Sequence, residues 1–363
     1  MRKFTKWAMA AAVVAGSMAP IAPAGAAAES FDVLVFSKTA AFRHTECINS
    51  GTPAIKALGA ANNFTVDSTE DAAVFTDANL AKYETVVFLC TTGNVLNDTQ
   101  QGAFERYIQG GGGYLGVHSA SDTEYDWAWY GGLVGAYFRD HPGVPGVSPQ
   151  FQVASVDVLG HGTPATAELP DRWTREEEWY NFRTNPTGKV RVLANVDENT
   201  YNPRGYSVPG GSAPMGNPHP ISWCQNYDGG RSFYTAVGHK GVYFSEPLVL
   251  SHILGAIEMT AGAEEFNCTS YSEVTNLLGD LKDEGRLSAS AYASLSDRLQ
   301  RASVKSAAGH EVPATGLLEQ FIAKARNQVK GDADDLAVRE LLVQKATQLI
   351  AWEQDLDDQE NAK

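Results

Sequence analysis

The stretch GGGGYLGVHSAS, residues 110–121, decides the fold class of this chain. Its glycines predict a loop, Tyr114 to Val117 predict a short buried strand, and a sharp turn then carries His118 and Ser119. In open α/β sheets, ligands bind at the carboxyl ends of the strands, and an elbow at such an end presents a reactive side chain. We therefore expect a functional site here. The elbow residue is a histidine, whereas better-known enzymes with this kind of elbow carry cysteine or serine there.

Apolar runs alternate with helical patterns around this stretch. Phe31 to Ser37 (FDVLVFS) and Thr85 to Thr91 (TVVFLCT) are nearly continuous apolar runs, which indicates buried strands. Asn97 and Asp98 mark the start of a helix between the second run and the elbow. The alternation predicts an α/β fold with a mostly parallel sheet covered on both faces. Three loops should then leave the same edge of the sheet, carrying Arg43 and His44, Thr91 to Asn94, and His118 and Ser119.

The pattern changes after Cys268. Leucines and other apolar residues recur there at helical spacing, which predicts a small all-α bundle of about four antiparallel helices. This segment contains no motif for chemistry. We therefore expect three parts, a signal peptide at 1–28, an α/β domain at 29–268 and a helical module at 269–363.

The first residues predict export. Three basic residues precede an apolar run from Trp7 to Met18, and small residues then lead to an A-x-A-like cleavage site near Ala26 or Ala28. The apolar run is shorter than the roughly 18 residues that a spanning helix needs. The sequence therefore predicts a secreted, extracellular protein that does not insert into a membrane.

Charge and cysteine content fit this compartment. The formal net charge is −15, and residues 1–28 carry basic groups but no acidic ones, so the mature chain is more acidic still. Such a chain repels nucleic acid and anionic lipid, so we expect no nucleic-acid partner. Its 4 cysteines predict two disulfides in an exported protein. Their spacing leaves all three connectivities open and contains no CxxC metal pattern.

Aromatic residues and carboxylates gather in two further stretches. Tyr125 to Gly132 contains Trp127 and follows Asp122 closely, and such clusters grip sugar rings, although ordinary core packing also explains them. In the run EEEWY, residues 176–180, Glu178 directly precedes Trp-Tyr and is the carboxylate that we expect to point inward. The Pro- and Gly-rich segment 201–220 is expected to form a loop over the site.

An ordered set of motifs resembles the trehalose-utilisation (ThuA-like) family over about residues 30–265. The motifs are Phe42-Arg43-His44, Gly113 to Ala120, Asp140-His141-Pro142, Glu178-Trp179-Tyr180, and Trp223 with Gly229 to His239. The resemblance implies a class I glutamine-amidotransferase-like fold, a flavodoxin-like α/β sandwich. It also implies an association with sugar metabolism, in which secreted members are often labelled glycosyl hydrolases. The helical tail more loosely resembles the FIMAH modules of secreted bacterial enzymes.

The chain departs from the family pattern at two cysteines. Cys47 and Cys90 stand where the family usually has Ser or Thr-like residues, and both should lie on neighbouring loops at one edge of the sheet. We predict that they pair. Cys224 and Cys268 would then form the second bridge, which would tie a late loop to the end of the domain.

The favoured hypothesis is an enzyme that acts on carbohydrate, such as a trehalose-type, keto-sugar or glycoside substrate, by histidine and carboxylate acid–base chemistry. Amidotransferases of this fold need a thiolate at the elbow, so His118 argues against glutamine hydrolysis. His118 suits general acid–base work, with Glu178 or Asp122 as its carboxylate partner. The expected substrate-binding residues are Arg43, His44, Ser119, Trp127, Tyr180 and His239.

Two alternatives remain open. In the first, His44, His118, His141 and His239, with Glu178, converge on a divalent metal such as zinc in a hydrolase or hydratase, although no local spacing such as HExxH supports this. In the second, the protein is a non-catalytic carbohydrate-binding or cell-surface module. Under any of these hypotheses, the helical tail could contact cell wall or polymer.

Overall fold

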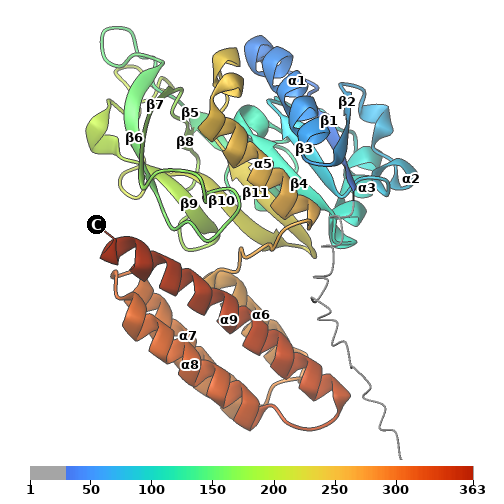
Figure 1. Cartoon of the computed structure of the whole chain (residues 1–363), viewed down its shortest axis with the longest axis vertical. Coiled ribbons are helices and arrows are strands. Elements are labelled where there is room, and N and C mark those ends of the chain that lie inside the picture. Colours follow the sequence, from blue (N-terminus) through green and yellow to red (C-terminus); the bar gives the residue numbers. More distant parts are fainter. Residues whose placement is uncertain (1–29, 363) are drawn as a thin grey trace, which may run out of the picture.

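The computed structural model describes residues 30–362. These residues form an α/β unit and, beside it, a helical bundle (Figure 1). The segment that we predict to be a signal peptide, residues 1–28, lies outside the described residues. Within residues 30–362, no helix is both long and apolar enough to cross a membrane.

A nine-stranded sheet forms the centre of the α/β unit. Five neighbouring strands are parallel, and the other four run antiparallel to their neighbours. The spatial order is β2 (Phe64–Thr69), β1 (Phe31–Phe36), β3 (Thr85–Leu89), β4 (Gly113–Val117), β11 (Gly230–Thr235), β10 (Pro220–Tyr227), β9 (Arg191–Val196), β6 (Gln152–Val158) and β7 (Arg172–Glu177). A separate two-stranded ribbon joins β5 (Phe138–Asp140) to β8 (Asn181–Phe182). The predicted α/β sandwich with a mostly parallel sheet is confirmed.

Helices cover both faces of the parallel half. On one face lie α1 (Thr45–Ala61) and α5 (Pro247–Ala261), where Thr85 of β3 shares a 2.9 Å hydrogen bond with Thr260 of α5. Strand residues alternate between faces, so Phe88 of β3 points to the other side. There its ring contacts Phe104 of α3 (Asp98–Gln109) and Tyr130 of α4 (Ala128–Val134). The short helix α2 (Asp77–Leu80) packs beside α3.

The C-terminal segment forms the predicted bundle. Its helices are α6 (Tyr271–Asp283), α7 (Ala289–Ser306), α8 (Glu311–Gln328) and α9 (Ala333–Asn361). The leucine stripes point inward and form a hydrophobic core separate from that of the α/β unit, with Leu278, Leu295 and Leu342 fully buried. We call this bundle the helical module.

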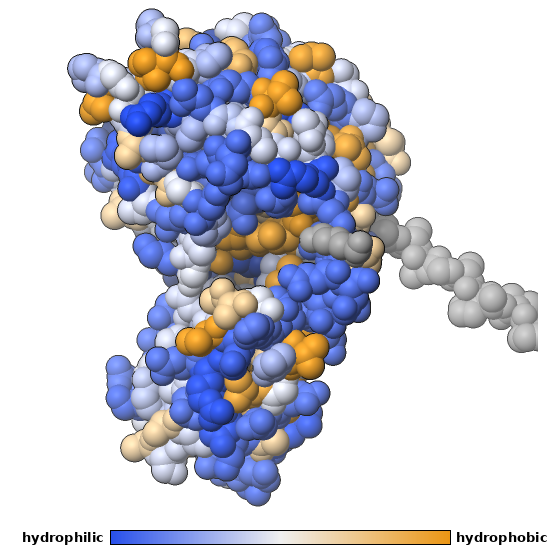
Figure 2. Space-filling view, turned by 90° about the vertical axis from the view of Figure 1, so that its left-hand side faces the viewer, coloured by the Kyte–Doolittle hydropathy of each residue, from blue (hydrophilic) through white to orange (hydrophobic). Residues whose placement is uncertain are grey.

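The helical module docks at the edge of the sheet where the parallel strands begin. The Arg191 guanidinium, at the start of β9, lies 4.4 Å from the centre of the Trp352 ring in α9. Asp355 of α9 accepts hydrogen bonds from the backbone N–H groups of His161 and Gly162, at 3.0 and 2.8 Å. Figure 2 shows the junction from the side, with apolar residues in the recess between the two units.

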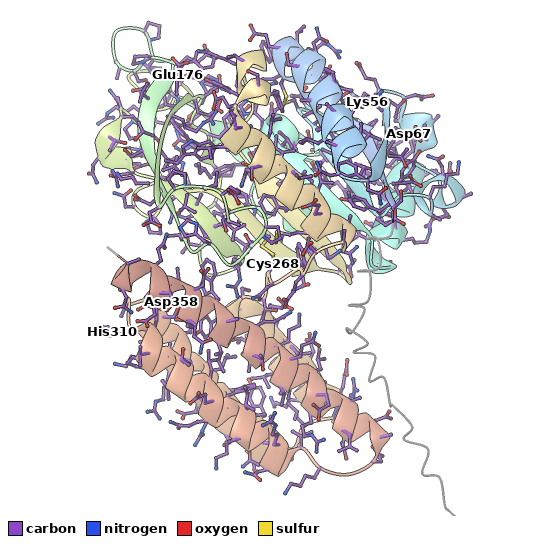
Figure 3. The ribbon with its side chains drawn as sticks, viewed as in Figure 1. Lys56, Asp67, Glu176, Cys268, His310 and Asp358 are labelled. Carbon is purple, nitrogen blue, oxygen red and sulfur yellow. A yellow bond between two sulfur atoms is a disulfide. The ribbon has the colours of Figure 1, made fainter. Side chains whose placement is uncertain are left out.

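Two disulfides join the predicted partners. Cys47 in the first turn of α1 pairs with Cys90, which directly follows β3. Cys224 of β10 pairs with Cys268, in the segment that connects α5 to the helical module, and Figure 3 shows Cys268 at this junction. The predicted connectivity is therefore confirmed.

Candidate active site

Four side chains from four different loops converge at the carboxyl edge of the parallel strands. His44 is the N-cap residue of α1 and follows β1, and His118 follows β4. Glu178 directly follows β7, and His239 lies beyond the end of β11. One nitrogen or carboxylate oxygen from each residue lies within 4.8 Å of those of the other three. We call these residues the cluster. The sequence predicted that the loops of His44 and His118 leave the same edge of the sheet, and Glu178 and His239 reach this edge from two further strands.

Short contacts hold three members of the cluster together. His239 Nδ1 lies 2.8 Å from Glu178 Oε2 and 3.1 Å from His118 Nε2. The third side of this triangle, from His118 Nε2 to Glu178 Oε2, is 3.4 Å. His118 and Glu178 are almost completely buried, whereas His239 keeps some exposure to solvent. The cluster is thus accessible from the side of His239.

The orientation of His118 is fixed from behind. Its Nδ1 lies 2.8 Å from the carbonyl oxygen of Ala236, which can only accept a hydrogen bond. Nδ1 therefore carries the ring proton, and the lone pair of Nε2 faces the cluster. The Tyr180 hydroxyl lies 2.9 Å from this Nε2. His118 has a φ of +51°, in the left-handed region that non-glycine residues seldom occupy. Such a backbone at a sheet edge is typical of a functional turn.

His44 is a neutral imidazole at ordinary pH. Burial, followed by the nearby His118 and His239, lowers the pKa of His44 from 6.5 to about 2. Its Nδ1 lies 3.1 Å from the Ser119 hydroxyl, and its Nε2 lies 3.4 Å from the hydroxyl of Tyr180. The ring therefore enters the cluster as an uncharged donor or acceptor.

Glu178 is the permanent negative charge of the cluster. Burial alone would raise its pKa, but the contacts of the carboxylate with His118 and His239 outweigh burial and hold the pKa of Glu178 far below its ordinary value. Its other oxygen, Oε1, lies 3.2 Å from His141 Nε2 and accepts a hydrogen bond from the Gln150 amide. His141 thus contacts the carboxylate from the side opposite to His118 and His239.

Glu177 is a buried residue of the site that the sequence analysis missed. Its Oε2 accepts hydrogen bonds from the Gly238 N–H at 3.0 Å and from the Arg175 guanidinium at 3.2 Å. It therefore ties together the two chain segments that carry Glu178 and His239. The available signal was spacing, because alternate residues of a strand share a face and Arg175 and Glu177 therefore lie on the same side as Trp173.

Asp122 lies beside the cluster on the turn that begins at His118. Its Oδ1 accepts a 2.6 Å hydrogen bond from the Tyr125 hydroxyl. Burial raises the pKa of Asp122 above 3.8, although the Tyr125 hydrogen bond and the nearby His118 and Arg183 oppose the shift. Glu178 and Asp122 are therefore carboxyl groups of the site whose pKa values are displaced in opposite directions.

Aromatic rings surround the entrance, and we call Phe42, Phe151 and Tyr206 the rim. Their rings lie 4.8 Å from His44, 4.9 Å from His239 and 4.7 Å from His141, respectively, measured between ring centroids. Phe42 is 67% exposed and Tyr206 is 48% exposed, so both rings are available to a ligand.

The expected loop at 201–220 carries Tyr206 of the rim. Ser207 and Ser212 of this loop donate hydrogen bonds to the buried Asp140 carboxylate. Burial alone would raise the pKa of Asp140, but these hydrogen bonds and one from Asn181 outweigh it, so the pKa is lowered. Asp140 therefore stays ionised and fastens the loop beside His141.

The structure does not bring every predicted residue into the cluster. Ser119 and Tyr180 contact it directly, as described above. Arg43 is turned away and forms a 2.7 Å ion pair with Glu70. Trp127 stacks on Trp129 of α4 and donates a hydrogen bond to Glu105 of α3. These contacts lie on the face of the sheet that α3 and α4 cover.

The chemistry of the cluster follows from its composition. Three imidazoles and one carboxylate can accept and relay protons, and they are also the side chains that bind transition metals. Of the four histidines predicted as metal candidates, the cluster contains His44, His118 and His239, whereas His141 reaches only the outer oxygen of Glu178.

Comparisons with known proteins give a family and a fold. The family model described as trehalose utilisation (ThuA) matches residues 32–260, and the model described as FIMAH domain matches residues 271–351. A ThuA-like protein from Bacteroides uniformis, 23% identical, superposes with a TM-score of 0.53 over 65% of this chain and 95% of its own. A ThuA-like protein from Parabacteroides merdae, 17% identical, has a TM-score of 0.49 over 65% of this chain and 91% of its own. No curated protein sequence gives a significant match.

Proposed function

We propose, from the premise that this chain belongs to the trehalose-utilisation (ThuA) family, that it is a secreted enzyme that cleaves a C–O bond in a carbohydrate. The observation that carries the proposal is the pair of carboxyl groups beside His118. The pKa of Glu178 is lowered and that of Asp122 is raised. Such divergent pairs mark the base and acid roles in enzymes that work near neutral pH.

Each group has a definite part in this proposal. Asp122, in its protonated form, gives its proton to the leaving oxygen as the C–O bond breaks. The cluster around His118 and Glu178 takes a proton either from water, which then adds to the sugar carbon, or from a carbon next to a keto group, which leaves a double bond. The first route is hydrolysis and the second is elimination. The rim supplies apolar faces for the sugar ring.

The direct test is turnover of trehalose, its keto derivatives and a panel of glycosides by the mature chain. A reducing sugar released with uptake of water indicates hydrolysis, and an unsaturated product that absorbs in the ultraviolet indicates elimination. Specific sugar binding without turnover would replace the proposal by the non-catalytic carbohydrate-binding alternative. A chain that neither binds nor converts any of these sugars would overturn the proposal altogether.

We expect the pH dependence of kcat/KM to follow the ionisation of the Asp122 carboxyl group. The reaction needs its protonated form, so activity is full below the pKa of Asp122 and falls as the pH rises through it. Because burial raises that pKa, against the opposing Tyr125, Arg183 and His118, the fall lies at higher pH than for an exposed aspartate. The measurement is a profile from about pH 3 to 9.

The matched variant for this profile is Asp122→Asn, which keeps the shape of the side chain and removes its proton exchange. We expect it to lose about 10²-fold or more in kcat and to show no alkaline fall. An unchanged profile in the variant would remove Asp122 from the acid role.

We expect Tyr206→Ala to weaken sugar binding with little change in kcat. The exposed ring lies on the rim and touches His141 rather than the cluster, and an aromatic contact is worth about 0.5–1.5 kcal/mol. The change should therefore raise KM about two- to tenfold. Tyr206→Phe is the control and should keep most of the affinity, and an equal loss in both variants would contradict a stacking role.

We also propose that the helical module contacts cell wall or another polymer, as its position supports. It docks at the edge opposite the cluster and leaves the rim uncovered. The test is sedimentation of the full chain with insoluble wall and polysaccharide preparations. The Asp122→Asn variant should sediment like the wild type, and retention of the full chain in the supernatant with every preparation would reject this role.

A further inference from the structure

We propose that His44, His118, His239 and Glu178 together bind one divalent transition-metal ion of the zinc type. The proposal deepens the proposed function and rests on it only in placing the ion at the reacting centre. With the ion bound, the His118 and Glu178 lone pairs would be occupied, and a water on the ion would supply the base in their place. The binding itself follows from the geometry of the four side chains and can be measured without a sugar.

The spacing of the cluster matches that of metal ligands. Bonds of about 2.0–2.1 Å to nitrogen and oxygen in a tetrahedral site place neighbouring ligand atoms about 3.3–3.4 Å apart. The distances between His118 Nε2, His239 Nδ1 and Glu178 Oε2 are 2.8, 3.1 and 3.4 Å. These three atoms therefore form a triangle close in size to one face of the tetrahedron. His44 supplies the fourth atom within 4.8 Å of the others.

The cluster brings buried acceptor atoms face to face. His118 Nε2 carries a lone pair, because Nδ1 holds the ring proton and donates a hydrogen bond to the Ala236 carbonyl. Glu178 Oε2 is an anionic oxygen that faces it. The Tyr180 hydroxyl carries one proton, yet it faces two imidazole nitrogens, those of His118 at 2.9 Å and His44 at 3.4 Å. A cation at the centre would satisfy these buried lone pairs at once.

The neighbours of the cluster orient the ligands as the outer partners of metal sites do. Ligating histidines typically hydrogen-bond through their second ring nitrogen to a carbonyl, carboxylate or hydroxyl, and this contact fixes the ring. His118 uses the Ala236 carbonyl in this way, and His44 uses the Ser119 hydroxyl at 3.1 Å. Glu178 is held at its outer oxygen by His141 at 3.2 Å, which leaves Oε2 for the ion.

The donor set points to the class of ion. Three imidazole nitrogens and one carboxylate oxygen suit zinc and its first-row neighbours, whereas magnesium and calcium prefer oxygen ligands. Elemental analysis of the native protein identifies which first-row metal is present.

The test uses the full mature chain, residues 29–363, purified without a chelator and without a histidine tag. We expect about one first-row metal ion per chain. After removal of the metal by a chelator, calorimetric titration with zinc chloride should show one saturable site. Glu178→Gln and His239→Ala should each weaken zinc binding by more than about 100-fold, and Ser119→Ala by about 10-fold, as for outer partners of metal sites.

Two further variants separate metal binding from folding. His310→Ala removes an exposed histidine of the helical module and should bind zinc like the wild type. Tyr180→Phe removes a hydroxyl but keeps all four ligands, and it should also retain the metal. Circular dichroism and thermal melting of the metal-free variants show whether each is folded.

The metal proposal is overturned if the folded wild-type chain contains no stoichiometric metal and shows no saturable zinc site. It is also overturned if Glu178→Gln and His239→Ala, both folded, bind zinc like the wild type. Sugar turnover that survives complete removal of metal rejects a metal at the reacting centre and leaves the proposed function intact. Stoichiometric metal in a chain that converts no sugar rejects the proposed function alone and supports the metal site.

Discussion

Replacement of His118 by asparagine is expected to lower kcat for sugar cleavage by about 10²–10⁴-fold, the range for loss of one general acid–base group. His118 Nε2 lies at the centre of the contacts to His239, Glu178 and Tyr180, so no neighbouring group can take over its position. Under the metal proposal the same change removes a ligand, so the loss belongs at the upper end of this range.

Asparagine is the informative replacement because of the backbone. Its side chain tolerates the left-handed conformation that residue 118 adopts with φ of +51°, so a loss of activity cannot be ascribed to a strained turn. The measurement is kcat and KM together with thermal melting. The control, His310→Asn, changes an exposed histidine at the start of α8 and should match the wild type. A folded His118→Asn variant with normal turnover would remove His118 from the reaction.

The second large effect concerns the disulfides. Cys47 and Cys90 are separated by 43 residues, and Cys224 and Cys268 by 44. A loop of this length predicts a loss of about 4 kcal/mol in the free energy of unfolding for each bridge removed. We therefore expect both double alanine variants, one for each pair, to unfold at clearly lower denaturant concentration than the wild type.

The two bridges should differ in their effect on activity. The Cys47–Cys90 bridge begins three residues after His44, and the Cys90 sulfur contacts the Gly238 carbonyl oxygen, next to His239, at 4.0 Å. The Cys224–Cys268 bridge instead lies where the helical module begins. Under conditions in which both variants are folded, turnover should fall for Cys47→Ala/Cys90→Ala and remain for Cys224→Ala/Cys268→Ala. Equal losses would show that neither bridge has a special relation to the cluster.

Much of the fold was predictable because local pattern and tertiary role agree. The strand in the apolar run that begins at Phe31 and the helix capped by Asn97 appear where the apolar pattern and the capping residue place them. Helix α1 begins at Thr45, directly after its N-cap residue His44, and carries Pro53 in its interior. Strand β10 was not predicted, since its start at Pro220 adjoins the loop rich in proline and glycine.

The site was predictable only as far as topology determines it. Parallel strands bring their carboxyl ends together, so His44, His118 and His239 meet at one edge. Trp127 and Tyr206 are both aromatic residues near turns, but their position depends on which element they pack against. Trp127 meets Glu105 of α3, whereas Tyr206 is carried to His141 by a loop that the buried Asp140 fastens from a distance in sequence. Such contacts between remote segments leave no periodic trace in the chain.

The docking of the helical module sets the module and the cluster at opposite ends of the parallel strands. The module attaches where the parallel strands begin, and the cluster lies where they end. Strands of 5 or 6 residues place these ends about 20 Å apart. A molecule attached to a polymer through the helical module would direct the cluster and the rim away from that polymer, into the surrounding medium. It would therefore process soluble sugars that diffuse to it, and the material that anchors it would stay out of its reach.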